Sequence, residues 1–146
     1  MTQAEDLVRR LFEEAFDRRE YDVLTQLVAE RYLEHALAPF GASEPGEVAG
    51  PDHMRGVIAW LVAQYPDLRM FVEMTAATGD LVVARVRSEG TNLGPLNGVM
   101  PPTGRSFSAH QTHWYRICDG RLCEHWADRD DLGTLLQLGV IPRPAA

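Results

Sequence analysis

Lysine is absent from this chain of 146 residues, so all 14 basic residues are arginines, a bias typical of GC-rich genomes. The 21 acidic residues outnumber them and give a net charge of −7. Nucleic acids and anionic membranes both attract clustered basic surfaces, so we expect neither class of partner.

Long apolar runs are absent as well. No stretch approaches the ~20 apolar residues that a helix needs to span a bilayer. The first ten residues are charged and amphipathic, and they lack the apolar core of a signal peptide. We therefore expect a cytoplasmic protein.

Cysteine is scarce, with only Cys118 and Cys123 on either side of Asp119-Gly120. A metal site needs more ligands at closer spacing, so we expect no metal here. A hairpin turn at Asp119-Gly120 can bring the two cysteines near each other. In a reducing compartment we nevertheless expect two small buried thiols.

The remaining composition, 45% hydrophobic and 24% charged, fits one folded domain over residues 1–146. The spacing of apolar residues predicts three amphipathic helices: Ala4–Asp17, Asp22–Leu33 and Asp52–Tyr65, the last capped by Asp52 and ended by Pro66. We expect an irregular segment over Arg31–Phe40 and a flexible loop over Gly41–Pro51.

After Pro66 the apolar period becomes that of strands. Four strands are predicted, followed by a short closing helix at Asp131–Leu138: Leu68–Thr78, Leu81–Gly90, Arg105–Cys118 and Arg121–Ala127. Gly79-Asp80 and Asp119-Gly120 mark hairpin turns, and Asn92–Gly104 a loop. Helices followed by an antiparallel meander indicate an α+β fold.

Short motifs in this second half occur in a specific order: Tyr65-Pro66-Asp67-Leu68, Gly79-Asp80, Gly90-Thr91, Pro102-Thr103-Gly104-Arg105, Arg116-Ile117, Asp119-Gly120-Arg121, Glu124-His125-Trp126 and Gln137-Leu138-Gly139. Together they resemble the SnoaL-like polyketide cyclase family of the nuclear transport factor 2-like superfamily. The resemblance implies a cone-shaped α+β barrel, in which N-terminal helices pack on a strongly curved antiparallel sheet and enclose a hydrophobic cavity. It also implies intramolecular aldol ring closure of aromatic polyketides without metal or organic cofactor. Close relatives instead hydroxylate the ring system.

The family's cyclases carry a Gln-x-His pair on the third strand, which Gln111 and His113 match. Both side chains lie on one strand face and can donate hydrogen bonds to a substrate carbonyl. The cyclases' catalytic aspartate directly follows the tryptophan of Glu-His-Trp, but this chain has Ala127 there. Asp128 reaches the cavity face only through a β-bulge. Asp130 either serves the site or caps a helix.

Two hairpin registers are open. A two-residue turn at Asp119-Gly120 pairs His113 with Trp126, whereas a glycine bulge pairs His113 with Ala127. The family pattern favours the second register. The cavity face then carries Cys123, His125 and Ala127 beside Gln111, His113 and Tyr115.

Further residues are expected to contact the substrate. His35 follows Tyr32 where related chains often carry a polar cavity residue, and Asn92 stands where many relatives have histidine. We expect Arg85 and Arg116 to pair with carboxylates. Apolar walls for a flat polycyclic substrate are expected from Trp60, Phe71, Met74, Phe107, Trp114 and Trp126, and polar or small wall positions from Tyr115, His125 and Ala127.

Because the cyclase aspartate is missing, the sequence favours a hydroxylase-type tailoring enzyme of aromatic polyketide biosynthesis, with weak or no aldol activity. Neither a dinucleotide fingerprint nor a metal-ligand triad is recognisable, so oxygen chemistry would draw electrons from the substrate or a partner reductase. A true aldol cyclase and a non-catalytic small-molecule binding module are the alternatives. We expect a homodimer, paired through an outer sheet face that carries His110 and Trp114.

Overall fold

The first helix forms as predicted. The computed structural model describes residues 1–39 and 44–145. Thr2 and Glu5 form a capping box at the start of α1 (Gln3–Arg10), which continues into the π-helical segment η1 (Leu11–Asp17). Leu11 and Phe12 are fully buried, so this amphipathic face anchors the core under the sheet.

The second predicted helix, Asp22–Leu33, is wrong in its C-terminal half. A short helical stretch, η2 (Tyr21–Val23) and α2 (Leu24–Leu27), is followed directly by the strand β1 (Val28–Glu34). Pairing with two neighbouring strands overrides the local helical spacing. The irregular segment expected from Arg31 therefore begins only after Glu34.

The predicted loop Gly41–Pro51 is shorter than expected, and residues 40–43 lie outside the described residues. The strand β2 (Gly46–Ala49) pairs antiparallel with β1, and α3 (Gly50–Gln64) begins immediately after it. Ala49, not Asp52, is the N-cap. A side chain at Gly50 would place its Cβ 2.0 Å from the carbonyl oxygen of Ala29, so α3 packs tightly on β1.

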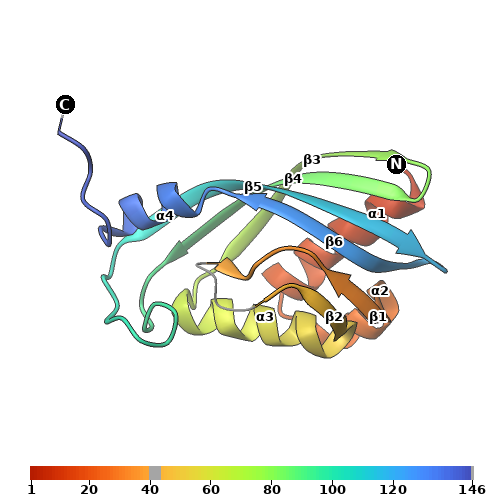
Figure 1. Cartoon of the computed structure of the whole chain (residues 1–146), viewed down its shortest axis with the longest axis horizontal. Helices are drawn as coiled ribbons and strands as arrows, with labels where there is room; N and C mark the ends of the chain where they lie inside the picture. The colour runs from red at the N-terminus through yellow and green to blue at the C-terminus, as the bar shows by residue number, and fades with distance from the viewer. Residues whose placement is uncertain (40–43, 146) are drawn as a thin grey trace.

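The four predicted strands are confirmed as β3 (Arg69–Thr78), β4 (Leu81–Thr91), β5 (Ser106–Cys118) and β6 (Arg121–Arg129). They form an antiparallel meander within a six-stranded sheet of order β2-β1-β6-β5-β4-β3. The prediction of a fully antiparallel sheet is wrong for one pair of strands, because β1 runs parallel to β6. Figure 1 shows the long curved strands on one side and α1 and α3 on the other, with α3 beside β1 and β2. The α+β class is confirmed.

The β5–β6 hairpin combines a tight turn with a bulge. Asp119 and Gly120 both have positive φ, 49° and 77°, as a two-residue turn requires. The register then shifts between Arg116 and Ile117, which leaves Cys123 as the extra residue of β6. His113 therefore pairs with Ala127, the favoured register, although the bulge lies at Cys123 and not at the turn glycine.

The expectation of free cysteines is wrong. Cys118 and Cys123 form a disulfide across the end of this hairpin. The turn and the bulge together bring their Cα atoms to 5.7 Å, within the range that a disulfide bridges.

The closing helix α4 (Asp131–Leu138) forms as predicted, capped by Asp130 and ended by Gly139 at φ 77°. Within the described part of the chain, every helix is too short or too polar to cross a membrane.

Candidate functional site

A cavity of about 90 Å³ lies between the helices and the inner face of the sheet. Phe12 and Phe16 from the first helix, Met54 and Leu61 from α3 and Met70 from β3 make most of its wall apolar. Its polar wall is formed by residues from β1, α3, β4, β5, β6 and α4: Glu34, His53, Ser88, Gln111, His113, Tyr115, His125, Arg129, Asp131 and Thr134.

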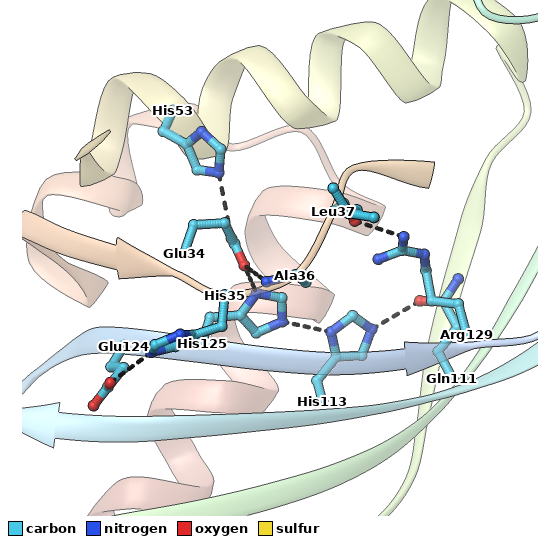
Figure 2. Close-up of polar contacts among 10 residues, drawn as sticks. All are labelled: Glu34, His35, Ala36, Leu37, His53, Gln111, His113, Glu124, His125 and Arg129. Carbon is cyan, nitrogen blue, oxygen red and sulfur yellow. Dashed lines mark hydrogen bonds and ion pairs between the residues drawn. The ribbon is translucent and has the colours of Figure 1, made fainter. Parts of the chain in front are cut away.

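The polar wall contains a continuous hydrogen-bonded chain (Figure 2). Oε1 of Gln111 lies 2.8 Å from Nε2 of His113, and Nδ1 of His113 lies 2.9 Å from Nε2 of His125. Nδ1 of His125 lies 2.7 Å from Oε1 of Glu34. The two imidazole rings are nearly parallel, with centroids 5.2 Å apart. Glu34, His113 and His125 are all buried.

The direction of the Gln111–His113 hydrogen bond decides where the protons of this hydrogen-bonded chain lie. With Oε1 of Gln111 accepting from Nε2–H of His113, the bare Nδ1 of His113 accepts from Nε2–H of His125. Nδ1–H of His125 donates to Glu34, so His125 carries both ring protons and balances the carboxylate. Turning the Gln111 amide reverses the direction at His113 and leaves His125 neutral. The site therefore has two proton arrangements that differ by one proton.

The electrostatics agree with an ionised Glu34 and a neutral His113. Burial alone would raise the pKa of Glu34, but hydrogen bonds from His125 and His53 outweigh it and lower that pKa to about 2. The backbone N–H of Ala36 also donates to Glu34, at 3.0 Å. Burial lowers the pKa of His113 well below its usual value, and the positive charges of His125 and Arg129 lower it further. His113 is consequently uncharged near neutral pH.

A third histidine approaches the same carboxylate from the opposite side. His53, on α3, lies with Nε2 3.4 Å from Oε2 of Glu34 (Figure 2). Among the described residues, Nδ1 of His53 has no hydrogen-bond partner. Glu34 thus orients the ring of His53, a residue that lines the cavity.

Of the polar residues predicted for the site, the following line the cavity: Gln111, His113, Tyr115 and His125. Ala127 is opposite His113 in the sheet and shares the strand face of His125, but it is not among the lining residues. Cys123, expected on the same face, sits in the bulge and is bonded to Cys118.

Three predicted residues lie outside the cavity. His35 stacks on Trp126 with ring centroids 4.8 Å apart, and its Nε2 lies 2.7 Å from Glu124. In Figure 2 the contact between His35 and Glu124 lies apart from the buried hydrogen-bonded chain. Asp128 is exposed on β6 two positions beyond Trp126, on the strand face opposite His125 and Ala127. The expected bulge therefore does not bring Asp128 inward.

Asp130, a predicted catalytic residue, instead caps α4 by accepting from the backbone N–H of Gly133 at 2.8 Å. Asn92 is buried and holds the β4–β5 loop, donating to the carbonyl of Gly94 at 2.8 Å and accepting from the N–H of Thr103 at 2.9 Å. The Asn92 amide is hydrogen-bonded to backbone groups of the loop, and Asn92 is not among the residues that line the cavity.

The expected aromatic walls are only partly realised. Phe107 lines the cavity, whereas Trp60 and Phe71 do not. Phe71 stacks instead under the guanidinium of Arg87, 4.2 Å from its ring centroid. Trp114 is 38% exposed on β5. The homodimer expected through its strand face stays a prediction.

The two expected surface arginines pair with carboxylates as predicted. Arg85 lies 3.4 Å from Glu73, and Arg116 lies within 3.0 Å of both Asp80 and Glu124.

Sequence reasoning missed Glu34, His53 and Arg129. Glu34 lay in a segment predicted to be irregular, so its strand alternation with the buried Tyr32 was not visible. His53 follows the misplaced cap of α3 and carried no motif. Arg129 lies two residues beyond the predicted end of β6, and its guanidinium donates to the carbonyl of Leu37 at 2.6 Å.

Comparison with known proteins places the chain in a family. The SnoaL-like polyketide cyclase model matches residues 6–138. Aklanonic acid methyl ester cyclase DauD of Streptomyces sp. (strain C5) is 33% identical over 135 residues, which cover 92% of this chain and 80% of that protein. The crystal structure of IdmH from Streptomyces antibioticus, a candidate polyketide cyclase, has a TM-score of 0.80 at 34% identity, covering 94% of this chain and 99% of IdmH.

A hydroxylase-type protein is similar as well. AclR from Streptomyces galilaeus, a candidate hydroxylase, has a TM-score of 0.77 at 25% identity, covering 98% of this chain and 85% of AclR. The match of the family model over nearly the whole chain is decisive: this chain belongs to the SnoaL-like polyketide cyclase family.

Proposed function

We propose that the protein closes a ring in an aromatic polyketide by intramolecular aldol chemistry, using the histidine–carboxylate chain of the cavity. The observation that carries the proposal is the position of Glu34, which holds His125 and His53 on either side of one buried carboxylate. Such a ring closure needs a base for a proton next to a carbonyl and donors for the enolate oxygen.

The donors come from β5. In the arrangement in which the Gln111 oxygen accepts from His113, neutral His113 carries its proton on Nε2. A substrate carbonyl that takes the place of the Gln111 oxygen receives this hydrogen bond, and the Gln111 amide can add a second. Because His113 stays neutral, it donates to the enolate without giving its proton away.

The base is His53. Nε2–H donates to Glu34, which leaves the lone pair of Nδ1 for the proton on carbon. The Glu34 carboxylate stabilises the imidazolium that forms, as a carboxylate does for the histidine of a hydrolase triad. His53 therefore replaces the aspartate that this chain lacks at position 127.

The steps balance within the substrate. His53 removes a proton from the carbon next to one carbonyl, and the enolate carbon attacks a second carbonyl carbon to form the new C–C bond. The resulting alkoxide then takes a proton back from His53. No electron acceptor is needed, and enclosure by apolar walls keeps the two carbons together.

Substrate entry requires the cavity to widen. Its volume of about 90 Å³ is well below the ~300–1,000 Å³ of typical small-molecule sites. The segment Ala36–Pro39 forms part of the wall, and Arg129 holds it through the carbonyl of Leu37. We expect this segment to move when a polycyclic substrate enters.

The hydroxylase that the sequence favoured is the second candidate. Ala127 and the similarity to AclR support it. That interpretation took position 127 as the place of the base, and the cavity offers His53 and Glu34 for this role. Hydroxylation also needs an oxidant and electrons from the substrate or a partner reductase.

One incubation separates the candidates. The purified protein is mixed with aklanonic acid methyl ester, and the products are followed by liquid chromatography and mass spectrometry. The proposal predicts a cyclised product with the mass of the substrate. A product heavier by one oxygen, formed only with added reductase, would support the hydroxylase. Binding without any product would support a non-catalytic binding module.

A further inference from the structure

Tyr65 is a buried tyrosine whose hydroxyl has no hydrogen-bond partner within the described residues. The residue is 3% exposed and belongs to the cavity lining. A buried hydroxyl without a partner costs stability, because it has lost its hydrogen bonds to water. In the ligand-free protein this hydroxyl therefore contributes only a cost.

Tyr65 lies far along the cavity from the histidine chain. It follows α3, and its ring meets Phe107 edge-on with centroids 4.8 Å apart. The Cβ of Tyr65 packs over Gly90, the β4 residue opposite Phe107. A Cβ added at Gly90 would lie only 2.9 Å from the Cβ of Tyr65. Phe107 precedes Gln111 by four residues on β5, which corresponds to about 13 Å along the strand.

The surroundings of the hydroxyl keep it protonated. Burial and the nearby negative charge of Asp131 raise the pKa of Tyr65 to about 12. At neutral pH the phenol therefore remains a hydrogen-bond donor. The hydroxyl is buried and has no acceptor among the described residues, so a ligand in the cavity can supply one.

We infer that the Tyr65 hydroxyl is a specificity-determining group that donates a hydrogen bond to a carbonyl oxygen on the substrate's terminal ring. This inference rests on the proposed function and adds to it the oxygen pattern of the substrate. One carbonyl lies at Gln111 and His113, and a second acceptor oxygen lies at the end of the ring system near Phe107. The phenol itself touches no reacting carbon, so its role is binding and orientation.

The chain contains a matched control in Tyr32. Its residue is fully buried and its hydroxyl also lacks a partner within the described residues, but Tyr32 does not line the cavity. Replacing either tyrosine by phenylalanine removes one unpaired hydroxyl and keeps the ring. Only the replacement at position 65 removes a group from the ligand site.

The experiment measures binding of two flat probes of the same ring number, 1,4-anthraquinone and anthracene, by quenching of tryptophan fluorescence. Wild type, Tyr65→Phe and Tyr32→Phe are compared, and each ligand-free melting temperature is recorded. We expect Tyr65→Phe to bind the quinone about tenfold more weakly and anthracene unchanged. Tyr32→Phe should bind both probes like wild type, and neither variant should melt at a lower temperature.

The outcomes separate this inference from the proposed function. If wild type binds both probes and Tyr65→Phe keeps its full affinity for the quinone, the role of Tyr65 is wrong while the cavity proposal stands. If Tyr65→Phe weakens both probes equally and melts lower, the hydroxyl is structural and the inference is again wrong. If wild type binds neither probe, the proposed function and this inference both fail.

Discussion

Glu34 accepts a hydrogen bond from Nδ1 of His125 at 2.7 Å inside the cavity, where both side chains are 9% exposed. This contact joins β1 to the neighbouring strand β6, where Glu34 and His125 are register partners. It turns two histidines of the hairpin β5–β6 into a chain that ends on a carboxylate.

Replacing Glu34 by glutamine should lower kcat about 100-fold, because neither His53 nor His125 keeps a negatively charged partner. The measurement is the rate of product formation under saturating substrate. The matched control is Glu124→Gln on the outer face, where the carboxylate binds His35 and Arg116 away from the cavity. Equal rates for wild type and Glu34→Gln would remove Glu34 from the mechanism.

The same carboxylate should make stability depend on pH. The pKa of Glu34 is lowered from 4.5 to about 2 in the folded state, so its stabilisation is present above pH 4.5. It is lost as pH falls through the folded value. Urea unfolding should show wild type more stable than Glu34→Gln by roughly 3 kcal/mol at pH 6, and the two nearly equal at pH 2. A difference that stays constant over this range would contradict the assignment.

The disulfide can be tested directly. Intact-mass measurement after thiol labelling should find Cys118 and Cys123 blocked until a reductant is added. The double variant Cys118→Ser with Cys123→Ser should lose roughly 2 kcal/mol of unfolding free energy, because the bond closes only a short loop. Two reactive thiols in the untreated protein would instead support the original expectation of free cysteines.

An aspartate at position 127 tests why its absence is tolerated. Ala127 is opposite His113 in the sheet. By the family resemblance, this is the position at which a cyclase carries its aspartate base. Ala127→Asp in a His53→Ala background should therefore recover part of the activity that His53→Ala alone loses. A matched carboxylate on the outer face, Trp126→Asp, should recover nothing. If His53→Ala is fully active by itself, the base lies elsewhere.

The sequence was informative where one element carried its own signal. The Gln-x-His spacing on β5 placed Gln111 and His113 together, and the family pattern favoured the register that the bulge at Cys123 produces. Glu34 was beyond reach for a physical reason. The helical spacing of Leu24, Leu27 and Val28 continues into β1, and only pairing with β2 and β6 makes that segment a strand. His53 meets Glu34 through a contact between α3 and β1 that no local pattern encodes.

The central claim is that the cavity removes a proton from carbon, and deuterium exchange tests this most directly. The substrate is incubated with the protein in D2O, and loss of the proton signal next to its carbonyl is followed by NMR. Wild type should exchange that proton at a rate at least equal to ring closure, and His53→Ala should lose the exchange while still binding substrate. If His53→Ala exchanges this proton as fast as wild type, His53 is not the base, whether the product is cyclised or hydroxylated.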